Sequence, residues 1–118
     1  PEGSVLWHCS LGKDRCGMVT ALVLTMLGVS REDIIEDYLL TNEVNAPKAE
    51  ELYRYIMADS GDELIAESVK QAYLADRAYL EAAFAEMEEK CGSLHSYVTD
   101  WLGVSEEQIE SFRNQVCD

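Results

Sequence analysis

One short apolar run, Val5–Trp7, resembles a β-strand, and every later hydrophobic pattern in the chain is helical. An isolated strand has no partner for its backbone hydrogen bonds and is not stable in water. We therefore expect residues 4–9 to form a strand of a sheet supplied from upstream, and residues 16–118 to form about six helices. The chain begins at Pro1 rather than Met, and we expect it to be the C-terminal portion of a single α/β domain.

Apolar spacing and end signals place the expected helices. Residues 17–27 are apolar almost all round, which is typical of a helix at the centre of a domain, and Gly28 is a natural helix end. Serines that can cap a helix precede several later segments, and Pro47, just after Asn45, suits a first helical position. The expected helix starts lie near Ser30, Pro47, Leu64, Leu80, Ser93 and Ser105, with breaks at Gly61 and Gly92.

Charge narrows the range of partners. The 118 residues contain 9 Lys and Arg against 23 Asp and Glu, which gives a formal net charge of −14. A field of that sign repels nucleic acids and anionic lipid surfaces, and no apolar stretch reaches the roughly 18 residues of a membrane span. We expect neither nucleic-acid binding nor stable membrane insertion. A phosphate ligand would need a local positive cluster, which Lys13 and Arg15 supply.

The cysteines and histidines do not form a metal-binding pattern. Four cysteines lack C-x-x-C spacing and only two histidines are present, so no metal, cofactor or disulfide framework is expected. Reduced thiols favour a cytoplasmic location. We expect Cys91 to lie in the core, Cys117 in the tail and His95 in solvent, and His8 to have a structural role. Tyr97 and Trp101, four residues apart, are expected to pack in the core.

The residues that can carry chemistry lie between the expected strand and the first helix, where five residues separate Cys9 from Arg15. A loop that leads from a strand into a helix can curl its backbone amides around an oxyanion. Cys9 would be the nucleophile, the bidentate fork of Arg15 would bind phosphate, and Asp14 would protonate the leaving oxygen. We expect a phosphate-binding loop over 9–15, with substrate contacts from Ser10, Leu11, Gly12, Lys13, Arg15 and Cys16.

Such a nucleophile must be ionised. A free thiol with a pKa of about 8.5 is only about 3% thiolate at neutral pH, so the loop must lower the pKa of Cys9. A helix dipole contributes about 0.3–1 kcal/mol, whereas each charge-assisted hydrogen bond contributes about 1.5–3 kcal/mol. We therefore expect amides and hydroxyls of the loop to do most of the lowering.

The run His8-Cys9-x-x-Gly12-Lys13-Asp14-Arg15-x-Gly17 resembles the signature of the atypical bacterial tyrosine phosphatase family. Members of that family act on phosphotyrosine and, in some cases, on phosphoinositides. The similarity extends to residues 36–40 and 92–105 and is least clear over residues 43–75, which we interpret as a mobile helical cover over the site.

The resemblance implies that Cys9 is the nucleophile, that Arg15 binds phosphate and that Asp14 is the general acid. Lys13 would add a second positive charge that favours substrates with more than one phosphate. One departure is Cys16, because the family usually has a hydroxyl residue there. Two cysteines then lie at the two ends of the loop, where an oxidised Cys9 would be trapped as a reversible disulfide.

The sequence thus predicts the C-terminal part of an α/β cysteine-phosphatase fold that hydrolyses phosphomonoesters through a phosphocysteine intermediate. The expected substrate is a phosphorylated protein, in the first place one with phosphotyrosine; dual specificity or phosphoinositide substrates are left open. The alternative is a catalytically weak phosphate-binding or helical interaction module. A nucleotide-binding loop is excluded because Asp14 stands where Ser or Thr is required. The unpaired strand edge also predicts a homodimer.

Overall fold

The computed structural model describes residues 3–117. These residues form seven α-helices and one π-helix, in the order α1 (Asp14–Leu27), α2 (Arg31–Leu39), α3 (Thr41–Ser60), α4 (Glu63–Tyr73), α5 (Arg77–Cys91), α6 (Leu94–Ser96), η1 (Tyr97–Trp101, the π-helix) and α7 (Glu106–Val116). The expected helical architecture is confirmed. None of these helices combines the length and the apolar character that a membrane crossing requires.

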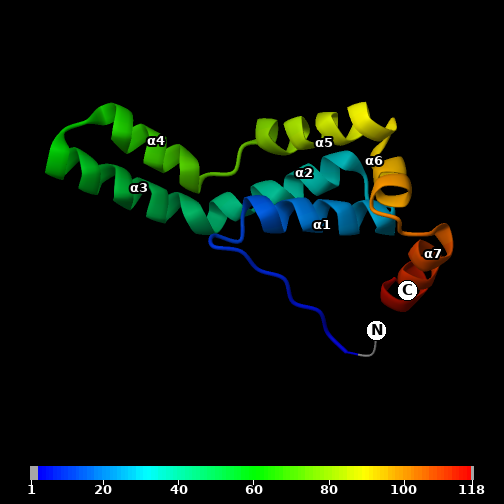
Figure 1. Ribbon diagram of the computed structural model, residues 1–118. Coiled ribbons are helices and arrows are strands. Elements are labelled where there is room, and N and C mark those ends of the chain that lie inside the picture. The colour runs from blue at the N-terminus through cyan, green and yellow to red at the C-terminus, as the bar shows by residue number, and fades with distance from the viewer. Residues whose placement is uncertain (1–2, 118) are drawn as a thin grey trace.

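The strand expected over residues 4–9 does not form. This segment runs away from the helices as an extended trace, and no strand is found among residues 3–117 to pair with it (Figure 1). Without a neighbour the ladder hydrogen bonds cannot be made, and Val5, Leu6 and Trp7 remain exposed. A side-chain contact to α1 is made where Trp7 Nε1 donates to Thr20 Oγ1 at 3.3 Å. The homodimer predicted from this edge stays a prediction.

The core lies between α1, α2, α5 and α6 (Figure 1). Helix α1 was expected at the centre of the domain. Among the described residues, however, Ala21 is the only residue of α1 that is fully buried, and Met18 and Val19 are 38% and 44% exposed. One apolar side of α1 is therefore open. The buried cluster consists of Ala21, Ile34, Ile35, Tyr38, Ala75, Leu80, Phe84, Met87 and Leu94.

Most helix ends follow the expected signals. The side chains of Ser30, Ser93 and Ser105 each accept a hydrogen bond from a first-turn amide, and Ser105 with Gln108 forms a complete capping box. The ends at Gly28, Gly61 and Gly92 adopt the left-handed conformation that glycine reaches without steric cost.

Pro47 is the exception, because it lies inside α3 instead of starting it. Leu40 keeps helical angles (φ −57°, ψ −23°) between α2 and α3, so the helix is already under way at Thr41. Asn45 does not cap: its side-chain amide donates to the carbonyl of Tyr73 at 3.1 Å. The helix boundary was wrong because this asparagine serves a tertiary contact.

The sixth helix is also shorter than expected and continues as η1, in which the amide of Leu102 bonds the carbonyl of Tyr97. The rings of Tyr97 and Trp101 stack with centroids 6.2 Å apart. Tyr97 packs against the core, but Trp101 is 61% exposed, so the prediction of core packing is wrong for Trp101. His95 is exposed as expected.

Helices α3 and α4 form a hairpin that projects from the other helices (Figure 1). Ala49 and Ala66 are fully buried between them, and their small side chains allow close packing. The projection explains a radius of gyration of 17.5 Å, against about 13 Å for a compact domain of this length. The helical part of the prediction for residues 43–75 is confirmed; whether the hairpin covers the site stays a prediction.

Candidate active site

The loop that precedes α1 reverses the chain at Gly12, whose φ of 65° lies in the left-handed region that favours glycine. Helix α1 then begins at Asp14, and the side chain of Lys13 makes no capping hydrogen bond to it. The first amides of a helix have no intrahelical acceptor. They are consequently free to bind an anion held by the loop.

The thiol of Cys9 is half-buried and accepts hydrogen bonds from amides of the loop and of the first turn of α1. The backbone amide of Cys16 lowers the pKa of Cys9 most, and the thiol of Cys16 and the amides of Leu11 and Gly12 add to it. Burial opposes them, and the resulting pKa of Cys9 is about 6. The backbone amides of the loop contribute as expected, whereas the side-chain donor is the thiol of Cys16 and not a hydroxyl.

The pKa of Cys16 is shifted in the opposite direction. Burial raises the pKa of Cys16, and so do the hydrogen bond that its thiol donates to Cys9 and the negative charge there. At neutral pH Cys9 is therefore the thiolate of the pair and Cys16 the neutral donor. Both are free thiols in the structure, and the disulfide between them stays a prediction.

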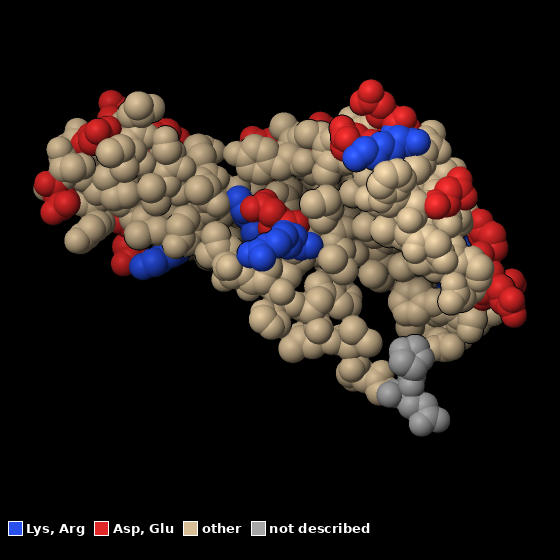
Figure 2. Space-filling model, viewed as in Figure 1, with Lys and Arg blue, Asp and Glu red and all other residues tan. Residues whose placement is uncertain are grey.

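Arg15 is exposed. Its Nη2 donates to Ser10 Oγ at 3.2 Å. This hydrogen bond connects the residue that follows Cys9 with the last residue of the loop. Basic side chains gather at the start of α1, beside acidic ones, between the hairpin and the remaining helices (Figure 2). We call Cys9, Ser10, Arg15 and Cys16 the thiol cluster.

Lys13 lies in different surroundings and is only 3% exposed. Its ammonium group donates to the carbonyls of Ala72 at 2.8 Å and Leu74 at 2.9 Å, where α4 ends, and lies 5.5 Å from the ring centre of Tyr79. These contacts tie the loop to the base of the hairpin. The predicted contact between Lys13 and the substrate is not tested by them and stays a prediction.

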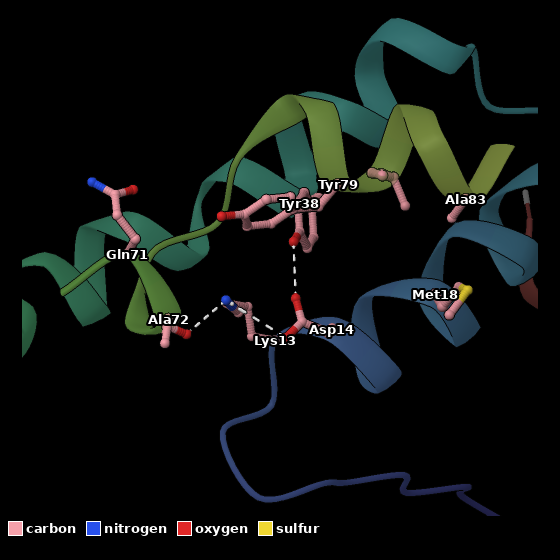
Figure 3. Close-up of a pocket in the computed structure, with 9 residues that line it drawn as sticks. Lys13, Asp14, Met18, Tyr38, Gln71, Ala72, Tyr79 and Ala83 are labelled. Atoms are coloured by element: carbon pink, nitrogen blue, oxygen red, sulfur yellow. Dashed lines mark hydrogen bonds and ion pairs between the residues drawn. The ribbon is translucent and has the colours of Figure 1, made fainter. Parts of the chain in front are cut away.

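Asp14 has a partner for each carboxylate oxygen. Tyr38 Oη donates to Oδ1 at 3.2 Å, and Lys13 Nζ lies 3.5 Å from Oδ2. We call Lys13 and Asp14 the anchored pair. Both side chains point towards α2 and the α4–α5 connection, at a cavity of about 440 Å³ (Figure 3).

The structure thus divides the predicted site residues between the thiol cluster and the anchored pair. Leu11 and Gly12 contribute backbone amides to the former. The hydrogen bond between Tyr38 and Asp14 was not predicted, because the two residues lie 24 positions apart and no local pattern indicates that contact. Among residues 3–117 no group of three or more His, Cys, Asp or Glu side chains is arranged to hold a metal ion.

Comparison with known proteins connects this loop to a family. The model of the tyrosine phosphatase family matches residues 1–118. The triple specificity protein phosphatase PtpB of Mycobacterium tuberculosis is 38% identical over 117 residues, which cover 92% of this chain and 42% of PtpB. A Cupriavidus necator protein, H16_A0669, is 34% identical over 107 residues, 90% of this chain and 38% of its own length.

A tyrosine-protein phosphatase of Nostoc commune is 26% identical over 123 residues, which cover 95% of this chain and 38% of that protein. The chain therefore spans about two fifths of the length of these relatives. The similarity includes the loop with Cys9 and Arg15 and the helices behind it. With a family model that matches its whole length, the chain belongs to the tyrosine phosphatase family.

Proposed function

We propose that this chain supplies the phosphate-binding loop and helical part of a cysteine-dependent phosphatase that hydrolyses phosphotyrosine in proteins. The observation that carries the proposal is Cys9, a half-buried thiol whose pKa is lowered to about 6 by the amides of a loop at a helix start. That arrangement makes a nucleophile and an oxyanion cradle from the same atoms.

In the first step the thiolate of Cys9 attacks phosphorus, and the bond between phosphorus and the ester oxygen breaks. Asp14 gives its proton to that oxygen, which leaves as the free hydroxyl of the substrate. Arg15 and the loop amides stabilise the charge on the three other phosphoryl oxygens during the transfer. The product of this step is a phosphocysteine and a neutral leaving group.

In the second step water attacks the phosphocysteine, and the carboxylate of Asp14 takes the proton that water loses. The bond between phosphorus and sulfur breaks, inorganic phosphate leaves and the thiolate of Cys9 is restored. Cys16 supports this step because its thiol hydrogen-bonds Cys9 and stabilises the sulfur as it regains negative charge. Because Arg15 stabilises the charge, the reaction needs no metal ion, and a chelator should not inhibit it.

Phosphotyrosine is the favoured substrate class for two reasons. The first is that the tyrosine phosphatase family model matches the chain. The second is that the ammonium group of Lys13, which would favour additional phosphates, already donates to two backbone carbonyls. Phosphoinositide hydrolysis is the alternative to be measured beside it, with the same protein and a phosphotyrosine peptide as the reference substrate.

The test is turnover of an aryl phosphate by the intact protein, wild type beside Cys9→Ser, with a chelator present. We expect chelator-resistant activity in the wild type and none above background in Cys9→Ser. Cys117→Ser is the matched control, because this exposed cysteine lies at the other end of the chain and should leave turnover unchanged. A wild type that binds phosphate without turnover would contradict the proposal and favour a phosphate-binding module.

A further inference from the structure

We propose that Tyr38 is a positioning residue for the general acid, and that its hydroxyl holds the carboxyl group of Asp14 in place for proton transfer. Tyr38 lies on α2, is only 6% exposed, and its Oη is 3.2 Å from Asp14 Oδ1 (Figure 3). The inference rests on the proposed function, since it assumes that Asp14 protonates the leaving oxygen.

The carboxyl group needs such a partner because packing alone does not fix its orientation. Asp14 is the first residue of α1, and its side chain is 62% exposed. Lys13 is 3.5 Å from the other oxygen, and two carbonyls hold Lys13 itself. The hydroxyl of Tyr38 therefore provides the second point that fixes the carboxyl plane.

The ring of Tyr38 is fixed independently of its hydroxyl. A Cβ atom at Gly17 would lie 2.8 Å from Cδ2 of Tyr38 and 3.0 Å from Cε2, so the bare backbone of Gly17 lets the ring pack onto the first turn of α1. This turn carries Asp14 and Arg15. A phenylalanine would keep that packing and remove only the hydrogen bond.

The hydroxyl also remains a donor under working conditions. Burial raises the pKa of Tyr38 far above its usual value, and the negative charge of Asp14 raises it further. The phenol therefore stays protonated across the neutral range. When Asp14 is the carboxylate, Tyr38 donates to it; when Asp14 is protonated, the phenol oxygen can accept.

The experiment compares two aryl phosphates on the intact protein. A poor leaving group such as phenoxide needs protonation far more than p-nitrophenoxide, so loss of general acid catalysis slows phenyl phosphate selectively. We expect Tyr38→Phe to lower kcat/KM for phenyl phosphate, which reports on the first step alone, about tenfold, the value of one hydrogen bond to a charged group at the lower end of its range. The kcat/KM for p-nitrophenyl phosphate should change much less.

Three further variants separate the outcomes. Asp14→Asn should lower kcat/KM for phenyl phosphate by about 10²–10⁴-fold, and adding Tyr38→Phe to it should cause no further loss. Tyr79→Phe is the matched control, because it removes a hydroxyl at the same cavity and keeps the ring beside Lys13. It should behave as wild type with both substrates.

An equal loss of kcat/KM with both substrates in Tyr38→Phe would show a merely structural role and overturn the inference. If Asp14→Asn shows the selective loss and Tyr38→Phe does not, the inference also fails while the proposed function stands. If Asp14→Asn itself lacks the selective loss, the assignment of the general acid in the proposed function is wrong, and the inference fails with it.

Discussion

The thiol cluster and the anchored pair lie within one short loop, yet their surroundings differ. In the thiol cluster Arg15 is exposed, and its recorded partner within the described residues is the hydroxyl of Ser10. In the anchored pair Lys13 is 3% exposed and bonds two carbonyls some sixty positions along the chain. The difference teaches that neighbouring charges of one motif can serve separate purposes, one available to a ligand and the other holding the loop.

The largest effect should come from the exposed arginine. Arg15→Lys keeps the charge but loses the fork that binds two phosphoryl oxygens, and we expect kcat/KM for an aryl phosphate to fall by about 10²–10³-fold. Arg54→Lys is the control, since Arg54 is exposed on α3 and, within residues 3–117, pairs with Glu50 on the same helix. A loss below threefold in Arg15→Lys would remove the distinction between the thiol cluster and the anchored pair.

Substitution of the buried lysine should act on stability. Lys13→Met leaves the carbonyls of Ala72 and Leu74 without their donor, which costs about 1–3 kcal/mol of unfolding free energy. Urea unfolding of the intact protein measures the change. Lys48→Met, at an exposed lysine of α3, should be near neutral. An unchanged midpoint in Lys13→Met, with a large rise in KM, would move Lys13 into the substrate site.

Packing between Gly17 and Tyr38 should have a smaller effect. Gly17→Ala gains up to about 1 kcal/mol of helix propensity, but its Cβ would meet a buried aromatic ring, and overpacking costs about 1–3 kcal/mol. We expect a net loss of stability in thermal unfolding. In a Tyr38→Ala background the same substitution should become stabilising; a loss of equal size there would contradict the contact.

Cys16 should have a modest effect on ionisation. The rate of Cys9 alkylation by iodoacetamide should rise with pH to a midpoint near 6 in the wild type, because the thiolate is the reactive form. Cys16→Ala removes one donor but keeps the backbone amide that lowers the pKa of Cys9 most. The midpoint should therefore move upward and stay below that of a free thiol. A downward shift would contradict the hydrogen bond between the thiols.

The same pair predicts how the protein recovers from oxidation. Peroxide should inactivate the wild type reversibly, with activity restored by a thiol reductant, because Cys16, which hydrogen-bonds Cys9, would trap the oxidised sulfur as a disulfide. In Cys16→Ala the loss should become irreversible under the same treatment. Inactivation of the wild type that a thiol cannot reverse would refute the predicted disulfide.

The sequence alone was informative where the physics is local. Serine caps and glycine ends depend on neighbours in the chain, and the structure has them as expected. The strand over residues 4–9 depends on a partner outside the local sequence and does not form. Pro47 was misplaced because Asn45 bonds Tyr73 across the hairpin, a contact without a local signature.

The chemistry of the site followed the same division. Cys9, Arg15 and the loop amides could be proposed as a site from spacing, because a loop that leads into a helix presents them together. The burial of Lys13 and the role of Tyr38 could not, since both depend on how α2 and α4 pack against the start of α1.

The central claim is that Cys9 carries the phosphoryl group, and its most direct test is to trap that intermediate. The intact protein would be acid-quenched during turnover of an aryl phosphate, and the peptide with Cys9 analysed by mass spectrometry. We predict one phosphoryl group on Cys9, absent when turnover is allowed to finish and absent in Cys9→Ser. Turnover at the full wild-type rate with a phosphoryl group on another residue, or on none, would contradict the account.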